Sequence, residues 1–261
     1  MKISKLFLYD EPSVPEIDLE NLSKFIKKSF NIDVEIRKNI FNFFTFPKNE
    51  ICNQLASCRI FDTRKPFERH MPSQEEIDFE MKTITDSNLL KNIIMYDGFE
   101  FQRIVSFLIP ENERIMNNFH LIITNKLTCT YDNRDYRYHG RAVICSNPSI
   151  ISTTGIVEAP AKPKEYYRHL MLNMLQGLNV ENAKKKFHGT YLDYHDSKLS
   201  RVIEGYAMQA TFYFLTGEAF CESKECRLHN AHWQQDLLYS QIKIGKLCHR
   251  HEQILQQLLC E

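Results

Sequence analysis

Residues 204–251 read EGYAMQATFYFLTGEAFCESKECRLHNAHWQQDLLYSQIKIGKLCHRH, and this stretch organises the rest of the chain. Cys221 and Cys226 enclose four residues, and Cys248 and His251 enclose two. Structural zinc sites take four such ligands in a tetrahedron, usually as two pairs on tight turns. The sequence therefore predicts a structural zinc ion held by Cys221, Cys226, Cys248 and His251.

Two points of this prediction stay open at the level of sequence. The cysteines would also suit a protein core as small apolar side chains, which is the usual role of cysteine inside a reduced protein. The fourth ligand is the weakest member, because three other histidines lie close to His251 and offer the same ring. These are His229, His232 and His249.

Composition bounds the class of protein. The chain has 261 residues, of which 43% are hydrophobic and 12% aromatic, enough for a sizeable folded core. The 33 basic residues equal the 33 acidic ones, which argues against a nucleic-acid partner because binding to phosphate backbones needs excess positive charge.

The apolar segments are short. None reaches the length needed to span a bilayer, and the opening residues 1–7 are too few before the first acidic residue to form a signal peptide. The sequence therefore predicts a cytoplasmic protein without a membrane partner, whose eight cysteines stay reduced.

Hydrophobic periodicity predicts an α/β (α+β) fold. The N-terminal region alternates strand, helix, strand and helix, at about residues 5–9, 15–30, 33–37 and 49–60. That order favours a right-handed crossover and a mixed sheet with helices packed on it. Residues 62–87 are highly charged and are expected to form solvated loops and a surface helix.

The middle of the chain is expected to be rich in strands. The predicted strands are residues 101–109, 120–124, 127–131, 141–146 and 150–157. Residues 132–135 read as the turn of a hairpin.

The C-terminal part is expected to be helical. A first helix covers residues 166–175 and stops at Gly177, and a polar interval then runs to Gly189. Asp196 or Ser197 caps a mostly buried helix that ends at Gly217. Two further helices are predicted at residues 237–247 and 252–259. The whole chain, residues 1–261, is expected to be one domain with three parts: 1–62, 99–160 and 164–261.

The segment from Phe214 to Cys221, followed by Cys226 and Cys248, resembles the archaemetzincin family of zinc metallopeptidases. In that family a long helix carries HExxHxxGxxH, and a cysteine directly after it begins a cluster of four. Gly217 matches the family's glycine, and His251 falls where the fourth cysteine would be. The resemblance implies a metzincin-like mixed sheet, a long buried helix and a C-terminal segment fastened by zinc.

The departures from the family motif concern catalysis. Ala210, Phe214 and Phe220 stand where the resemblance implies zinc-binding histidines, and Thr211 stands where it implies the general-base glutamate. A peptidase of this type needs a metal-activated water and a carboxylate to take its proton. We therefore expect no catalytic residues at these positions. The protein would then be a pseudoenzyme or a module that binds a peptide or protein.

The alternative is an active zinc-dependent hydrolase whose metal site has moved. Its candidate residues surround the start of the central helix: His188, Asp193, His195 and Glu204. An imidazole and a carboxylate at close spacing can share a metal. The competing interpretation of residues 193–196 is a polar loop that starts a helix.

Overall fold

The computed structural model describes residues 2–85, 93–218 and 220–260. Residues 86 and 87 of the charged stretch, and Ala219 of the segment that resembles archaemetzincins, lie outside the described residues.

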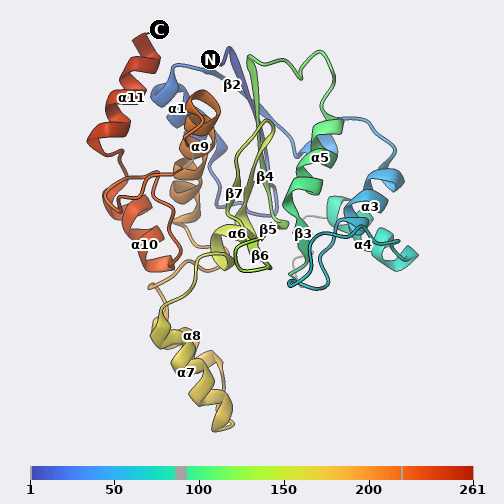
Figure 1. The fold of residues 1–261 in the computed structure, drawn as a ribbon, viewed down its shortest axis with the longest axis vertical. Coiled ribbons are helices and arrows are strands. Elements are labelled where there is room, and N and C mark those ends of the chain that lie inside the picture. Colours follow the sequence, from blue (N-terminus) through green and yellow to red (C-terminus); the bar gives the residue numbers. More distant parts are fainter. Residues whose placement is uncertain (1, 86–92, 219, 261) are drawn as a thin grey trace.

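A five-stranded mixed sheet forms the centre of the protein (Figure 1). Its order is β2-β1-β4-β8-β7. The strands are β1 (Lys5–Tyr9), β2 (Asp33–Arg37), β4 (Asn118–Thr124), β7 (Val143–Ile144) and β8 (Ser149–Ser152). β1, β2, β4 and β8 run parallel, and β7 pairs antiparallel with β8. The predicted α/β class is confirmed.

Helices cover both faces of this sheet, because successive strand residues point to opposite faces and both faces are apolar. Leu6 and Leu8 face a cluster that includes α1 (Leu19–Phe30) and α9 (Leu199–Thr216). Phe7 and Tyr9 face the opposite cluster. The helices of that second face are α2 (Ile40–Phe43), α3 (Lys48–Ser57), α4 (Gln74–Thr85) and α5 (Gly98–Leu108).

A smaller sheet of β3 (Met95–Asp97), β5 (Leu127–Asp132) and β6 (Arg137–Gly140) lies beside the first. β5 and β6 pair antiparallel around the turn predicted at residues 132–135, which confirms the hairpin. Of the strand predicted at residues 141–146, only β7 is formed.

Two predicted strands are wrong in whole or in part. Residues 101–109 lie almost entirely in helix α5, whose N-cap Asp97 accepts hydrogen bonds from the N–H groups of Phe99 and Glu100. Residues 150–157 begin in β8, but the Ser152 hydroxyl accepts from the N–H of Gly155 and so starts helix α6 (Thr153–Glu158). In both places a capping side chain starts a helix where the sequence pattern had suggested a strand.

Helix α9 agrees with the sequence prediction. Its buried residues extend from Leu199 to Phe212, and Gly217 ends it with φ 76°. That left-handed conformation suits glycine because it has no Cβ. The N-cap differs, since Lys198 takes that position without a side-chain bond.

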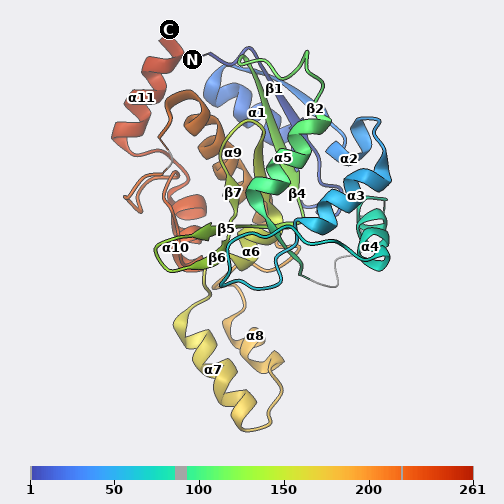
Figure 2. The same cartoon turned by 45° about the vertical axis from the view of Figure 1, so that its right-hand side comes forward.

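The C-terminal elements follow α9. They are α10 (Gln234–Leu238), the π-helix η1 (Tyr239–Ile244) and α11 (His249–Cys260). In the chain, helices α7 (Lys164–Leu175) and α8 (Glu181–Phe187) come after the last strand of the sheet and before α9. In space they project from the body as an arm (Figures 1 and 2). α8 lies inside the predicted polar interval. Within the described ranges, every helix is too short or too polar to cross a bilayer.

Candidate metal centre

The four predicted zinc ligands, all from the segment that follows α9, lie close together. The ligand atoms of all four lie within 4.8 Å of one another. Sγ of Cys248 lies 4.0 Å from Sγ of Cys221 and 3.1 Å from Nδ1 of His251. Sγ of Cys226 lies 3.7 Å from the same nitrogen. Ligands of a tetrahedral zinc ion would be about 3.7 Å apart for two sulfurs and slightly less for sulfur and nitrogen.

Local turns place these donors. The Cys221 N–H donates to the Leu228 carbonyl at 2.8 Å, and the Cys226 N–H donates to the Ser223 carbonyl at 3.2 Å. The Cys248 N–H points at the Cys226 sulfur, 3.4 Å away. His251 lies in the first turn of α11. Two pairs on two tight turns therefore meet, as a structural zinc site requires.

His251 is the histidine that faces the three sulfurs. It is buried, with 1% of its surface exposed, whereas His232 and His249 are exposed and His229 lies against the Cys221 carbonyl. Its other ring nitrogen, Nε2, lies 3.5 Å from a Glu218 carboxylate oxygen, which is an ion-pair distance and not a well-formed hydrogen bond. A carboxylate in this position commonly orients a ligating imidazole.

The thiols differ in acidity. Burial raises the pKa of Cys226 to about 12. Burial also disfavours the Cys248 thiolate, but hydrogen bonds from the backbone and ring of His251 outweigh it and lower the pKa of Cys248 to about 7. Three thiols and one imidazole fit zinc, which displaces thiol protons when it binds. All four tetrahedral positions would be filled by protein, as in structural sites.

The α9 positions that resemble the peptidase motif carry packing residues. Ala210 and Thr211 are fully buried, and the Thr211 hydroxyl donates to the Ala207 carbonyl at 2.8 Å. Phe214 stacks on Phe119 of β4 with ring centroids 4.7 Å apart. Phe220 lies beyond the helix and is 42% exposed. None of these four side chains is one of the usual zinc ligands.

The alternative site residues lie apart. His188 and Asp193 are exposed, His195 pairs with Glu16 at 3.1 Å, and Glu204 pairs with Arg227 at 3.0 Å. Among residues 2–85, 93–218 and 220–260, no potential metal-binding group contains any of the four candidates. The Asp196 carboxylate accepts from the Lys198 N–H at 2.9 Å, as expected of a helix-start loop.

A second possible metal group, which sequence reasoning missed, lies on the β5–β6 hairpin. It consists of Asp132, Asp135 and His139. Asp135 contacts His139 Nε2 at 2.8 Å. Asp132 is bound by Arg134, whose hydrogen bonds lower the pKa of Asp132 to about 2. The available signal was the closeness of these three residues around one turn, but both carboxylates already have an arginine partner, since Arg137 pairs with Asp135 at 2.8 Å.

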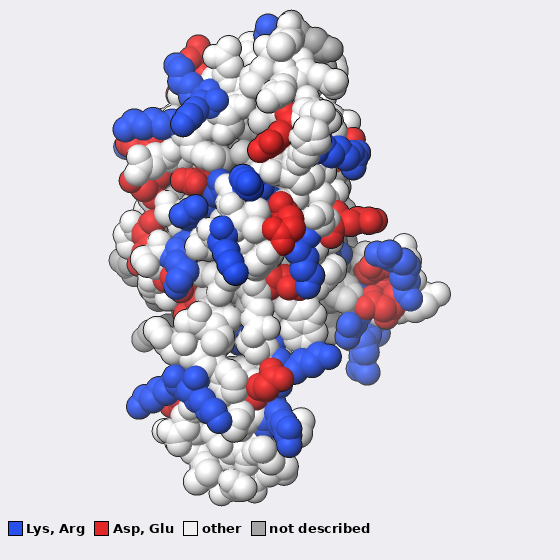
Figure 3. Space-filling view, turned by 90° about the vertical axis from the view of Figure 1, so that its left-hand side faces the viewer, with Lys and Arg blue, Asp and Glu red and all other residues white. Residues whose placement is uncertain are grey.

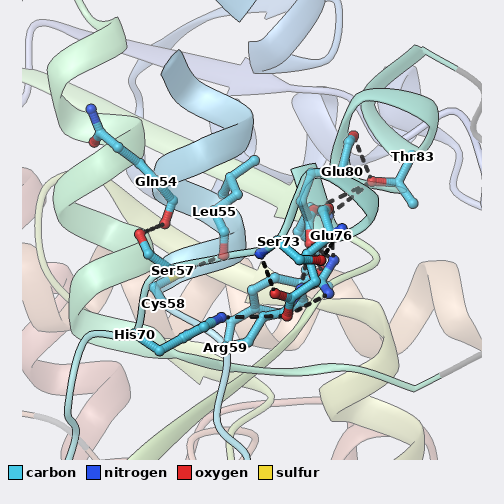
Figure 4. Close-up of polar contacts among 12 residues, drawn as sticks. Gln54, Leu55, Ser57, Cys58, Arg59, His70, Ser73, Glu76, Glu80 and Thr83 are labelled. Atoms are coloured by element: carbon cyan, nitrogen blue, oxygen red, sulfur yellow. Dashed lines mark hydrogen bonds and ion pairs between the residues drawn. The ribbon is translucent and has the colours of Figure 1, made fainter. Parts of the chain in front are cut away.

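A buried ionic network around Glu80 was also missed (Figure 4). Glu80 is fully buried and accepts from Arg59 at 2.6 Å, from Lys126 at 2.7 Å and from the Tyr96 hydroxyl at 2.8 Å. The prediction that residues 62–87 are solvated is therefore wrong at Glu80. The helix α4 that carries it buries one face, so that the Glu80 carboxylate pairs with two cations from other elements, and Glu76 of the same helix gives Arg59 a second partner at 3.5 Å.

Polar residues also line a cavity of about 160 Å³ at the carboxyl ends of β1 and β4. Glu11 is buried there and accepts from the Ser13 hydroxyl at 2.7 Å and from the Asn125 N–H at 3.1 Å. Burial raises its pKa. Ligands of open α/β sheets commonly bind at this edge, but the Glu11 carboxylate is already hydrogen-bonded within the protein.

Comparison with known proteins gives the family. No curated protein matches the chain. The solved structure of a zinc-dependent peptidase from Methanocorpusculum labreanum (strain Z) is similar, with a TM-score of 0.45 and 12% identity over 97% of this chain and 100% of that one. The sequence profile of the probable metallopeptidase family (DUF6775) matches residues 2–258. Since that match spans nearly the whole chain, the protein belongs to the probable metallopeptidase family.

Proposed function

We propose that the protein is an archaemetzincin-like, zinc-binding member of this family in which the zinc has a structural role. The observation that carries the proposal is the convergence of four donor atoms within 4.8 Å of one another. The proposed ligands are Cys221, Cys226, Cys248 and His251.

The zinc would fasten the C-terminal segment to the central helix. Cys221 lies in the segment that follows α9, and His251 lies in the first turn of α11, where its ring packs on Phe212 of α9 at 5.3 Å. Coordination would join these parts by bonds far stronger than the apolar contacts alone, and the binding free energy would become folding free energy.

The proposed protein does not hydrolyse peptides through α9. Hydrolysis of that kind requires an open coordination position on the metal and a carboxylate base nearby. Ala210 and Phe214 supply no ligand, and the Thr211 hydroxyl is bound to its own helix. The function that fits is binding of a peptide or protein by a scaffold that lacks the catalytic motif.

The second candidate function is a zinc-dependent hydrolase with a relocated site, and the family description favours it. Its residues His188, Asp193, His195 and Glu204 would have to move together, because His195 and Glu204 already have ionic partners on different elements.

Metal analysis of the purified protein separates the two functions. The structural-zinc proposal expects about one zinc ion per chain, lost in Cys226→Ser and in Cys248→Ser. Cys260→Ser is the matched control, because this exposed thiol lies outside the cluster. A second zinc equivalent that His195→Ala removes would favour the relocated hydrolase.

Activity is tested with a mixture of peptides analysed by mass spectrometry. The expected result is no cleavage, with or without a chelator. Cleavage that a chelator abolishes, and that survives Cys226→Ser, would overturn the proposal that the protein lacks peptidase activity.

A further inference from the structure

The arm formed by residues 162–188 has an apolar side that nothing in the described structure covers. Tyr167, Met171 and Leu175 recur every four residues along α7 and are 45%, 64% and 79% exposed. That spacing places them on one face of the helix. The opposite face is used, since Tyr166 packs in a small cluster with Phe187 of α8 and Tyr191.

The exposed apolar surface continues around the end of the arm. Its members, which we call the tip, are exposed between 36% and 79%: Met171, Leu172, Met174, Leu175, Leu178 and Val180. Figures 1 and 2 show the arm extending away from the body, with the turn between α7 and α8 at its far end. Large exposed apolar patches of this kind mark interaction sites.

Basic residues surround the arm behind the tip. The arm has six Lys or Arg residues, which we call the collar, and two Glu residues, so its net charge is +4. The collar consists of Lys162, Lys164, Arg168, Lys184, Lys185 and Lys186. The chain as a whole has zero net charge, so the rest of it carries −4. In Figure 3 the arm is the lower lobe, where blue side chains lie above a white end.

We propose that the arm docks the protein on an anionic lipid bilayer, with the tip among the headgroups and the collar against anionic lipids. Arg168 lies seven residues before Leu175, which is about 10 Å along a helix. Interfacial segments sink about 5–10 Å into a bilayer. The tip would therefore enter the membrane to the depth at which Arg168 reaches the headgroups.

The arrangement fits a bilayer better than a protein partner. The tip lies at the far end of a projecting arm, and its flexible methionine side chains adapt to a fluid surface that needs no matching shape. The negative remainder of the chain would be repelled by the same membrane surface that attracts the collar. This charge separation orients the molecule with the arm toward the membrane. The sequence-based expectation of no membrane partner rested on the lack of a spanning segment, and this proposal concerns adsorption.

Flotation with lipid vesicles tests the proposal. We expect the full chain to float with vesicles of phosphatidylcholine and phosphatidylserine, weakly with phosphatidylcholine alone, and less at high salt. Lys184→Gln/Lys185→Gln/Lys186→Gln should weaken binding about a hundredfold, since each basic residue contributes about fivefold. Lys24→Gln/Lys28→Gln/Lys38→Gln removes three exposed charges from the body and should weaken binding far less, because these residues lie outside the arm.

The tip is tested separately with paired methionine substitutions. Met171→Ser/Met174→Ser should weaken binding at least about tenfold, because two inserted side chains are lost. Met71→Ser/Met116→Ser, which alters two exposed methionines of the body, is the matched control and should bind as the original chain does. Unchanged thermal unfolding of both variants shows that folding is intact.

Three results would overturn the proposal. These are no flotation of the full chain with anionic vesicles, equal binding to neutral and anionic vesicles, and equal losses in the tip variant and its control. Light scattering gives a fourth: a dimer that Met171→Ser/Met174→Ser converts to a monomer would assign the tip to a second copy of the chain.

Discussion

His251 lies edge-on against Phe212, with ring centroids 5.3 Å apart and an angle of 69° between the rings. The proposed metal ligand and the buried side of α9 are therefore in direct contact. Whatever holds His251 in place also holds α11 against the central helix.

Metal removal should loosen this part of the protein first. We expect a chelator to raise hydrogen exchange in residues 220–260 and to leave β1 and β4 protected, because the donors lie only in the C-terminal segment. Cys226→Ser should exchange like the chelated protein, while Cys260→Ser should exchange like the untreated one. Exchange that rises equally in β1 would contradict a local role for the metal.

Loss of the Glu80 charge should destabilise the fold strongly. Glu80→Gln removes the ion-pair partner of the buried Lys126 and leaves Arg59 with only Glu76, and breaking a buried ion pair in this way costs about 3–5 kcal/mol. Urea unfolding measures the change. Glu75→Gln on the exposed side of α4 is the control. Equal unfolding midpoints for the two variants would show that the Glu80 network does not stabilise the fold.

Acid should weaken the fold through His120. Burial lowers the pKa of this histidine below 6.5, while its ring contacts the Tyr9 hydroxyl and the Glu113 carbonyl. As the pH falls below about 6.5, the unfolded chain gains a proton that the folded chain resists, so stability decreases, by at most about 1.4 kcal/mol per pH unit. Above that pH the effect is absent.

The measurement is the loss of unfolding free energy between pH 7.5 and 5.5. His120→Asn should lose less unfolding free energy than the original chain does. The exposed-site control His188→Asn should lose as much as the original chain. A slope that His120→Asn leaves unchanged would mean that another group is responsible.

Gly205→Ala should destabilise the protein, although alanine normally favours a helix over glycine. An added Cβ would lie 1.7 Å from Oε1 of Gln241, whose amide donates to the Arg227 carbonyl in a buried position. Overpacking of this kind costs about 1–3 kcal/mol. The same substitution made in a Gln241→Ala background should cost less, as a double-mutant cycle would measure. Equal costs in both backgrounds would exclude this contact as the cause.

Local patterns predicted most of the central sheet and α9. Strands β1, β2 and β4 of that sheet, and β5 of the smaller sheet, are short apolar or alternating runs, and α9 is a long apolar helix with a glycine stop. Helix α5 was missed because the exposed Phe99 and Phe107 add apolar residues outside its buried face. Its buried residues Phe101, Ile104 and Leu108 do follow a helical spacing, but the two added phenylalanines obscure it, and the Asp97 cap is the clearest helix signal.

The metal cluster was accessible to sequence reasoning, since each ligand pair is local. The Glu80 network was not, because Arg59, Tyr96 and Lys126 are separated from Glu80 by 16 to 46 positions and meet it only through packing. The arm's tip was likewise hidden, since an apolar stripe along α7 predicts a buried face until the fold shows that nothing covers it.

All four donors of the proposed zinc site fall between residues 221 and 251, whereas the central sheet is complete by residue 152. During synthesis, every strand of that sheet would leave the ribosome before Cys221, the first of the proposed donors. The sheet could therefore assemble without metal. A cell short of zinc would make a chain with a folded central sheet and a disordered C-terminal segment.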